Sequence, residues 1–143
     1  MSLAWHYAEA SDCDLLAAWN HQLIADEGHR NPMDVPQLLE RMRGWLSTDY
    51  KAVVFSAVEP VGYALFKNEP DSVYLRQFFI RRDRRGSGLG KEAFALLRGQ
   101  VWPRDSRLTV EVLCANEAAT AFWRSVGFRD YFLGLEMTPS PQS

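Results

Sequence analysis

The spacing of apolar residues in the first third of the chain predicts two helices. Leu15, Trp19 and Leu23 recur every four residues, which places them on one face of a helix. A segment rich in Gly and Pro follows, and Asp34 is the expected N-cap of a second helix. The buried face of that second helix is predicted to comprise Leu38, Leu39, Met42, Trp45 and Leu46.

The later two thirds of the chain alternate between extended and helical patterns. Strands are predicted at 4–9, 51–58, 61–66, 73–80, 107–113 and 128–137. The turn between 51–58 and 61–66 is expected at Glu59-Pro60. Apolar residues at helical spacing predict a helix from about residue 89 to Gln100, and another helix follows Asn116 as its cap.

The resulting order is β-α-α-β-β-β-α-β-α-β. Strands joined as hairpins come first and strand–helix alternation comes later, which favours an α/β fold of the α+β kind, with a mixed sheet and helices on both faces. We expect one domain over residues 1–138 and a flexible tail at 139–143.

Composition and charge limit the kind of partner. The 143 residues are 47% hydrophobic and carry a formal net charge of −2, which argues against a dedicated nucleic-acid-binding protein. No apolar run is long enough to cross a membrane and no signal peptide is recognisable, so a cytoplasmic protein is expected. The basic residues nevertheless cluster, which suits a small polyanionic ligand. This basic cluster comprises Arg76, Arg81, Arg82, Arg84, Arg85, Lys91 and Arg98.

A glycine-rich turn lies between the predicted strand at 73–80 and the helix that follows. Gly86, Gly88 and Gly90 free the backbone to curl, so that successive N–H groups and the helix N-terminus can bind a phosphate or pyrophosphate. A dinucleotide-binding fingerprint would need Gly where Lys91 stands, and a P-loop would need Ser or Thr where Glu92 stands. From the turn alone, a connector without a ligand is an equal alternative.

Two motifs in a fixed order give a resemblance to a known family. The first, Arg-x-x-Gly-x-Gly, falls at Arg85, Gly88 and Gly90. The second, Asn-x-x-Ala-x-x-Phe-aromatic-x-x-x-Gly-Phe, falls at Asn116, Ala119, Phe122, Trp123, Gly127 and Phe128. Together they resemble the signatures of the GNAT acyltransferases. The resemblance implies a GNAT-type fold and transfer of an acetyl group from acetyl-CoA to a primary amine by direct attack, without a metal.

The resemblance also implies where the cofactor lies. Pantetheine would pair with the exposed backbone of a strand that splays from its neighbour, and the pyrophosphate would lie on the glycine-rich turn. We expect Phe122 on the core-facing stripe of the last helix and Trp123 on its cofactor side. The expected cofactor-binding residues are Phe78, Phe79, Ile80, Arg85, Gly86, Ser87, Gly88, Leu89, Gly90, Lys91, Asn116, Ala119 and Trp123.

The residues that move protons are less well defined by the sequence. The acceptor amine needs a base, and the candidates are Glu27, His29 and Glu111. Relatives often have Tyr where Trp123 stands, as an acid for the leaving thiol. Here either Tyr131 or another tyrosine donates the proton, or the thiol leaves unaided.

The acceptor and the assembly stay open at this point. The acceptor could be a small molecule or a protein amine, and neither nucleic acid nor a membrane is expected as a partner. Relatives commonly end with two strands after Gly-Phe, but this chain has room for about one. The Gly28–Met33 loop or the second subunit of a homodimer would then close the acceptor pocket. The alternatives are a catalytically inactive CoA-binding or regulatory module and an interaction domain with an empty turn.

Overall fold

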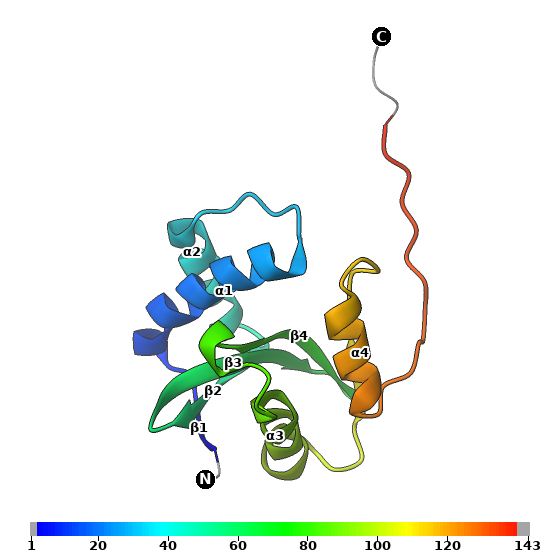
Figure 1. The fold of residues 1–143 in the computed structure, drawn as a ribbon. Helices are drawn as coiled ribbons and strands as arrows, with labels where there is room; N and C mark the ends of the chain where they lie inside the picture. The colour runs from blue at the N-terminus through cyan, green and yellow to red at the C-terminus, as the bar shows by residue number, and fades with distance from the viewer. Residues whose placement is uncertain (1–2, 140–143) are drawn as a thin grey trace.

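The strands form one five-stranded sheet in sequence order, β1-β2-β3-β4-β5 (Figure 1). The computed structural model describes residues 3–139. β1 to β4 are antiparallel, and β5 runs parallel to β4 because a helical connection crosses over between them. The strands are β1 (Ala4–Tyr7), β2 (Tyr50–Ala57), β3 (Glu59–Asn68), β4 (Ser72–Ile80) and β5 (Arg107–Val110).

Two helices cover each face of this sheet, as predicted (Figure 1). α1 (Cys13–Glu27) and α2 (Val35–Leu46) lie on one face, and α3 (Leu89–Leu96) and α4 (Glu117–Ser125) lie on the other. The expected helix up to Gln100 continues α3 as a π-helical turn over Leu97–Val101. Among residues 3–139, no helix is long and apolar enough to cross a membrane.

The predicted helix caps are present in the structure. The Asp34 carboxylate accepts a hydrogen bond from the Gln37 N–H, and the Gln37 side chain accepts one from the Asp34 N–H, at 2.9 Å each. Asn116 accepts from the Ala119 N–H at 3.2 Å. Each cap satisfies N–H groups that the first turn of a helix leaves free.

Alternating side chains of the sheet supply two separate cores. Toward α1 and α2 the sheet contributes Tyr63 and Phe79, which pack with Trp19. Toward α3 and α4 it contributes Phe55 and Phe66 among others. The β4 side chains therefore point alternately to the two sides, which decides which residues of that strand reach each helical layer.

The turn between β2 and β3 is tighter than predicted. Glu59 and Pro60 lie inside β3, where they pair with Ala57 and Ser56, and Val58 alone makes the turn. Val58 is 97% exposed and has a φ of 71°, a conformation that disfavours β-branched residues. Pro60 can enter the strand because it sits at a register shift near its start.

The strand predicted at 128–137 is absent from the structure. Phe128 packs on the α3/α4 core, but residues 129–139 extend away from the body without regular structure (Figure 1). The apolar pattern that suggested a strand is real, but a strand needs a hydrogen-bonded neighbour, and this segment has none within the described chain. β5 is also shorter than predicted and ends at Val110. Of the tail expected at 139–143, residues 140–143 lie outside the described part.

Candidate active site

A bulge in β4 marks the place where the sheet opens. Leu65 pairs with Gln77 and Phe66 pairs with Leu75, so Arg76 is an extra residue in β4. The pairing of β4 with β5 covers only Ser72–Leu75, on the N-terminal side of this bulge. From Arg76 to the end of β4, the strand therefore has a neighbour on its β3 side alone among residues 3–139.

Beyond the bulge, β4 presents free backbone groups to the gap. The Arg81 N–H donates to the Val61 carbonyl at 2.8 Å, and a Cβ added to Gly62 would lie 2.1 Å from the Phe79 carbonyl oxygen. These contacts place the backbone of Phe79 and Arg81 on the β3 side. Because the pattern alternates along a strand, the backbone of Phe78 and Ile80 faces the gap. Phe79, one of the expected cofactor-binding residues, thus has its backbone on the β3 side and its ring toward α1.

The glycine-rich turn joins this free edge to α3. Gly86 and Gly88 have φ values of 81° and 86°, and a Cβ added to either would meet no atom within 4 Å. The first hydrogen bond of α3 runs from the Glu92 N–H to the Gly88 carbonyl. Within the described part of the chain, no backbone carbonyl accepts from the N–H groups of residues 86–91. These groups form an open concavity suited to an anion.

The third glycine of the motif has a packing role. A Cβ on Gly90 would lie 3.1 Å from the ring of Phe122. An added Cβ at this position would require the Phe122 ring to shift by a few tenths of an ångström. Phe122 also stacks on Phe78, with ring centroids 6.0 Å apart. Gly90 and Phe122 therefore set the distance between the turn and α4.

The side chain of Arg85 points back to the protein and away from the turn. Its Nε donates to the Ile80 carbonyl at 2.7 Å, and its Nη2 donates to Asp26 at 2.9 Å. Arg82 donates to the same carboxylate at 3.0 Å. Burial disfavours the charged form of Asp26, but the hydrogen bonds from the two arginines outweigh it and lower the pKa of this carboxyl. The result is a clamp between α1 and the glycine-rich turn.

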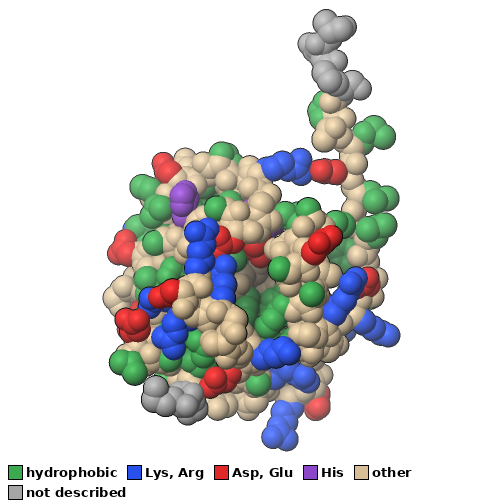
Figure 2. All heavy atoms as spheres, viewed as in Figure 1, with side chains coloured by type: hydrophobic (Ala, Val, Ile, Leu, Met, Phe, Trp, Pro, Cys, Tyr) green, Lys and Arg blue, Asp and Glu red, His purple; other side chains and the backbone are tan. Residues whose placement is uncertain are grey.

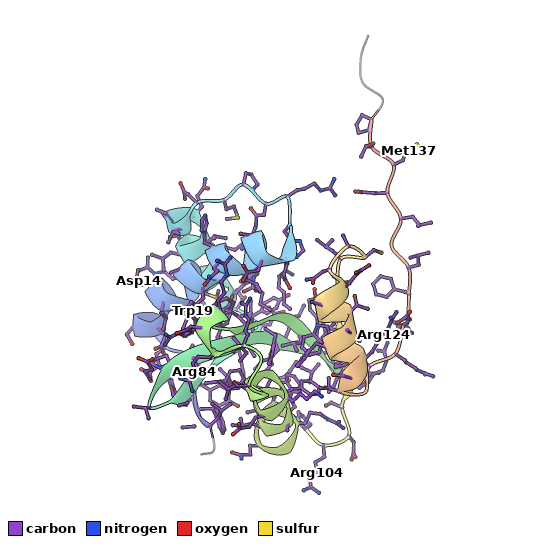
Figure 3. All side chains as sticks on the ribbon, in the orientation of Figure 1. Asp14, Trp19, Arg84, Arg104, Arg124 and Met137 are labelled. Atoms are coloured by element: carbon purple, nitrogen blue, oxygen red, sulfur yellow. The ribbon has the colours of Figure 1, made fainter. Side chains whose placement is uncertain are left out.

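Basic charge remains available beside the turn. Within residues 3–139, no acidic side chain lies within 4.0 Å of the Arg84 or Lys91 charges. Lys91 is exposed in the first turn of α3, and Arg84 is half-buried just before the turn (Figure 3). Figure 2 shows several Lys and Arg side chains gathered on the face that carries α3 and α4. A polyanion at the turn would meet favourable charge.

The two aromatic residues of α4 have the opposite orientation to that predicted. Trp123 packs against the α3/α4 core, with its ring centroid 5.4 Å from that of Phe78 and 5.7 Å from that of Phe94. Phe122 lies over Gly90 at the glycine-rich turn. The helical repeat fixes the angle between neighbours, but which one faces the core depends on where α4 sits over the sheet.

A second group of polar residues lies on the α1/α2 side, near the bulge. Glu27 and His29 are 3.3 Å apart at the end of α1. Burial raises the pKa of the Glu27 carboxyl, although His29 opposes the shift. The buried Tyr63 hydroxyl donates to Gln77 of β4 at 2.7 Å, and burial together with the Glu27 charge raises the pKa of Tyr63. This corner is therefore adjacent to the open part of β4.

The third candidate base, Glu111, lies elsewhere, just beyond the end of β5. The Tyr74 hydroxyl donates to it at 3.2 Å, and burial followed by the Glu111 charge raises the pKa of Tyr74 to about 12. The two residues line an open hollow of about 500 Å³ along β5, with Glu69, Pro70, Asp71, Ser72, Arg107 and Thr109. No hydrogen bond or ion pair in the described chain joins this pair to the Glu27 corner.

Tyr131 lies beside Arg107, which lines the Glu111 hollow, and makes no hydrogen bond to the Glu27 corner within the described residues. It is 74% exposed on the extended C-terminal segment, with its ring 4.8 Å from the guanidinium carbon of Arg107. The structure does not bring it to the glycine-rich turn. Asn116 and Ala119 form the cap of α4, as described above.

The comparisons with known proteins agree with this geometry. The model of the acetyltransferase (GNAT) family matches residues 8–128. The chain belongs to the GNAT acetyltransferase family. No curated protein sequence matches it. Solved structures do, among them an acetyltransferase from Thermus thermophilus, with 27% identity, a TM-score of 0.75, and coverage of 90% of this chain and 88% of that one.

Two further GNAT-type structures share the fold at lower identity. A predicted acetyltransferase from Clostridium acetobutylicum, solved with acetyl-CoA, has a TM-score of 0.72 at 15% identity and covers 95% of this chain and 96% of its own. The aminoglycoside N-acetyltransferase AAC(6')-Iy, solved with CoA, has a TM-score of 0.75 at 12% identity, with coverage of 96% and 94%. Both contain CoA-type ligands. Because the sequence identities are low, these two structures show that the fold is shared and nothing further about this GNAT member.

Some residues of the site were not found by sequence reasoning. A hydrogen bond between Tyr63 and Gln77 joins β3 to the open part of β4. The signal for it in the sequence was the polar side chain of Gln77 within the apolar run 73–80. Arg41 and Arg76 both lie over the ring of Trp45, at 4.4 and 4.8 Å from its centroid. This second pair is spread over α2 and β4, so only the tertiary structure brings it together.

Proposed function

We propose that this GNAT member transfers an acetyl group from acetyl-CoA to a primary amine by direct attack. The observation that carries the proposal is the juxtaposition of two unfilled sets of backbone groups. The free edge of β4 at Phe78 leads through Ile80, whose carbonyl accepts from Arg85, to the open concavity of residues 86–91. An extended diamide arm attached to a pyrophosphate has the matching shape and chemistry.

The cofactor-binding part of the site needs little rearrangement to accept CoA. The N–H groups of residues 86–91 would hold the pyrophosphate, with Lys91 and Arg84 adding charge. Phe78 would pair with the pantetheine amides, and the Asp26–Arg85 clamp would keep the turn in place. Asn116 and Ala119 keep the start of α4 formed beside the gap. We propose that Trp123 acts indirectly, by supporting the Phe78 ring from the core.

We propose Glu27, assisted by His29, as the base that prepares the acceptor amine. An alkylamine is largely protonated at neutral pH, with a reference pKa of about 10.4 for Lys, and must lose a proton before it can attack. Burial raises the pKa of Glu27, which brings it closer to the range useful for a base. His29 lies within 3.3 Å and can pass the proton to solvent. Glu111 is the alternative base, and its partner Tyr74 is too weak an acid to protonate a thiolate readily.

The acetyl group of the thioester is the electrophile that the cofactor supplies. A backbone N–H at the open end of β4 can stabilise the oxyanion. The leaving thiol has a pKa of about 8.5 and needs no strong acid. This agrees with the position of Trp123 in the core and with the exposed position of Tyr131 beside Arg107.

The proposal is tested by a screen of amine acceptors with acetyl-CoA, in which a thiol-reactive dye detects released CoA. We expect CoA release that depends on one class of amine, and loss of that release in the Glu27→Gln variant. Binding of acetyl-CoA without acceptor-dependent release, across small amines and peptide amines alike, would instead support an inactive CoA-binding module. The absence of a tyrosine at the Trp123 position is the observation that favours this second function.

A further inference from the structure

Two arginines without an acidic partner lie together on the α1/α2 side of the sheet. The guanidinium carbons of Arg41, in α2, and Arg76, in β4, lie 4.4 and 4.8 Å from the centroid of the Trp45 ring. Among residues 3–139, no acidic side chain lies within 4.0 Å of either guanidinium. Burial and then the Arg76 charge lower the pKa of Arg41, so the two cations oppose each other. This arginine pair, Arg41 and Arg76, favours the binding of an anion.

The hydrogen bonds around the arginine pair leave an excess of donors. Arg41 Nη2 donates to the Asn20 Oδ1 at 3.2 Å, and Arg76 Nη1 donates to the Tyr50 hydroxyl at 3.3 Å. Asn20 is 1% exposed, and its Nδ2 and the Arg41 Nε are buried donors without an acceptor in the described chain. Asn20 therefore holds the Arg41 side chain in place, while the surroundings contain no anionic acceptor of their own.

The arginine pair lies at the bulge that opens the sheet. Arg76 is the extra residue of the bulge, and Gln77 beside it accepts from the Tyr63 hydroxyl at 2.7 Å. Burial raises the pKa of Tyr63, the Glu27 charge adds to this rise and the Arg41 charge opposes it. A negative group and a positive group therefore act on the same hydroxyl, beside the open part of β4.

A molecule with an amine at one end and a carboxylate at the other matches this distribution of charge. Its amine would lie toward Glu27, and its carboxylate would lie at the arginine pair. A guanidinium presents a planar fork of N–H donors that fits a carboxylate in a bidentate manner. A diamine or polyamine would instead bring a second positive charge to two uncompensated cations, which is unfavourable.

We propose that the acceptor is a small amino acid, whose carboxylate is bound by Arg41 and Arg76 while its amine faces the thioester. This inference rests on the proposed function, because it names the acceptor class of the same reaction. Both arginines act as binding residues for the end of the acceptor that is remote from the reacting amine. Holding that end in place orients the amine for attack.

Matched acceptors give the first test. The panel contains the common α-amino acids, β-alanine, γ-aminobutyrate and 5-aminopentanoate, each compared with the amine that lacks its carboxylate. With acetyl-CoA and a thiol-reactive dye, we expect at least one amino acid to exceed its matched amine about thirtyfold in kcat/KM, as charge-assisted hydrogen bonds allow. Equal kcat/KM values with and without the carboxylate would overturn the inference and leave the proposed acetyl transfer standing.

Substitution of the arginines ties this selectivity to the site. Arg41→Gln and Arg76→Gln should each lower kcat/KM for the preferred amino acid about tenfold or more and leave the matched amine within about threefold. Arg43→Gln is the control, because Arg43 is an exposed arginine of the same helix without an ion pair among residues 3–139. Unchanged selectivity in the pair variants would overturn the inference. Arg76 is exposed, so its variant decides the matter if Arg41→Gln fails to fold.

Binding without turnover separates this inference from the proposed function. Calorimetric titration of the panel into the CoA-saturated protein measures the Kd of each compound in the absence of an acetyl donor. We expect the preferred amino acid to bind, with a Kd about tenfold higher in Arg76→Gln and unchanged in Arg43→Gln. Such binding without any CoA release from acetyl-CoA would contradict the proposed transfer and support the arginine site. Absence of binding by every amino acid of the panel would overturn the inference.

Discussion

At the residue scale, the α4 aromatics show how neighbouring positions divide between packing and function. Trp123 contacts Phe78, Phe94 and Phe128 in the core, whereas Phe122 covers Gly90 at the glycine-rich turn. A tyrosine at position 123 would bring a hydroxyl into this aromatic cluster. The tryptophan fills the same space and donates only through its indole N–H, which is not a useful acid.

Trp123→Ala should therefore reduce stability before it affects chemistry. Loss of a large, half-buried aromatic residue should lower the free energy of unfolding by about 3 kcal/mol. Trp123→Phe should cost less and keep turnover within a few-fold of wild type. Urea denaturation and steady-state kinetics measure the two effects. A hundredfold loss of kcat in the Trp123→Phe variant, with stability retained, would show that the indole N–H has a catalytic role.

Glu27 provides the prediction for pH. Since burial raises its pKa above the ordinary 4.5, its charged form is available only above that raised value. Activity should rise with pH through the raised pKa, and Glu27→Gln should remove this limb and lower kcat about a hundredfold or more. The same shift makes the free energy of unfolding depend on pH. The Glu27 carboxyl stabilises the fold below pH 4.5, and this contribution is lost as the pH rises through the folded-state pKa.

The matched variant for this test is Glu111→Gln. Both substitutions remove a carboxylate, but no hydrogen bond or ion pair in the described chain joins the two sites. If Glu27 is the base, the pH profile of the Glu111→Gln variant keeps its acidic limb. The reverse result would assign the base to Glu111.

At the scale of elements, the glycine-rich turn acts through its backbone. Gly88→Glu should abolish detectable acetyl-CoA binding in calorimetry, because the side chain would enter the concavity and its charge would repel a pyrophosphate. The left-handed conformation adds strain of about 1–2 kcal/mol, so the melting temperature should fall by several degrees while circular dichroism stays near wild type. Gly44→Glu is the control, since Gly44 lies on an open part of α2 without positive φ. Retained affinity in Gly88→Glu would place the phosphate site elsewhere.

The β2–β3 hairpin carries strain that a substitution can relieve. Val58 has a φ of 71°, which a β-branched residue tolerates poorly and asparagine tolerates well. Val58→Asn should raise the free energy of unfolding by about 1 kcal/mol, as measured by urea denaturation. The same change at Val35, at the start of α2 and outside the left-handed region, should give no such gain. No gain at Val58 would mean that the turn relaxes in solution.

At the scale of the whole molecule, ligand binding should stabilise the folded chain. A ligand at 100 times its Kd adds about 2.7 kcal/mol, which corresponds to roughly 5–10 °C for a domain of this size. We expect acetyl-CoA to raise the melting temperature by this amount. Dephospho-CoA should do nearly as well, because the pyrophosphate makes the main contacts with the turn. An unchanged melting curve at saturating acetyl-CoA would contradict CoA binding as a whole.

Features that depend on short stretches of chain could be predicted from the sequence. The order of helices and strands up to α4, the Asp34 and Asn116 caps and the glycine-rich turn follow from local spacing and turn chemistry. The GNAT family followed from two motifs, each of which lies within one turn or helix. Such patterns are readable because both the residues and the structure they specify are contiguous.

Contacts between residues far apart in the chain could not be predicted in this way. The bulge at Arg76, the direction of the Phe78 and Ile80 backbone and the turning of Arg85 toward Asp26 depend on how β3, β4 and α1 pack. The fate of the predicted strand at 128–137 depends on a neighbour, because a strand is completed by hydrogen bonds to another segment. Helices satisfy their backbone within themselves, whereas strands and sites are built from residues far apart in the chain, and local patterns carry no record of those contacts.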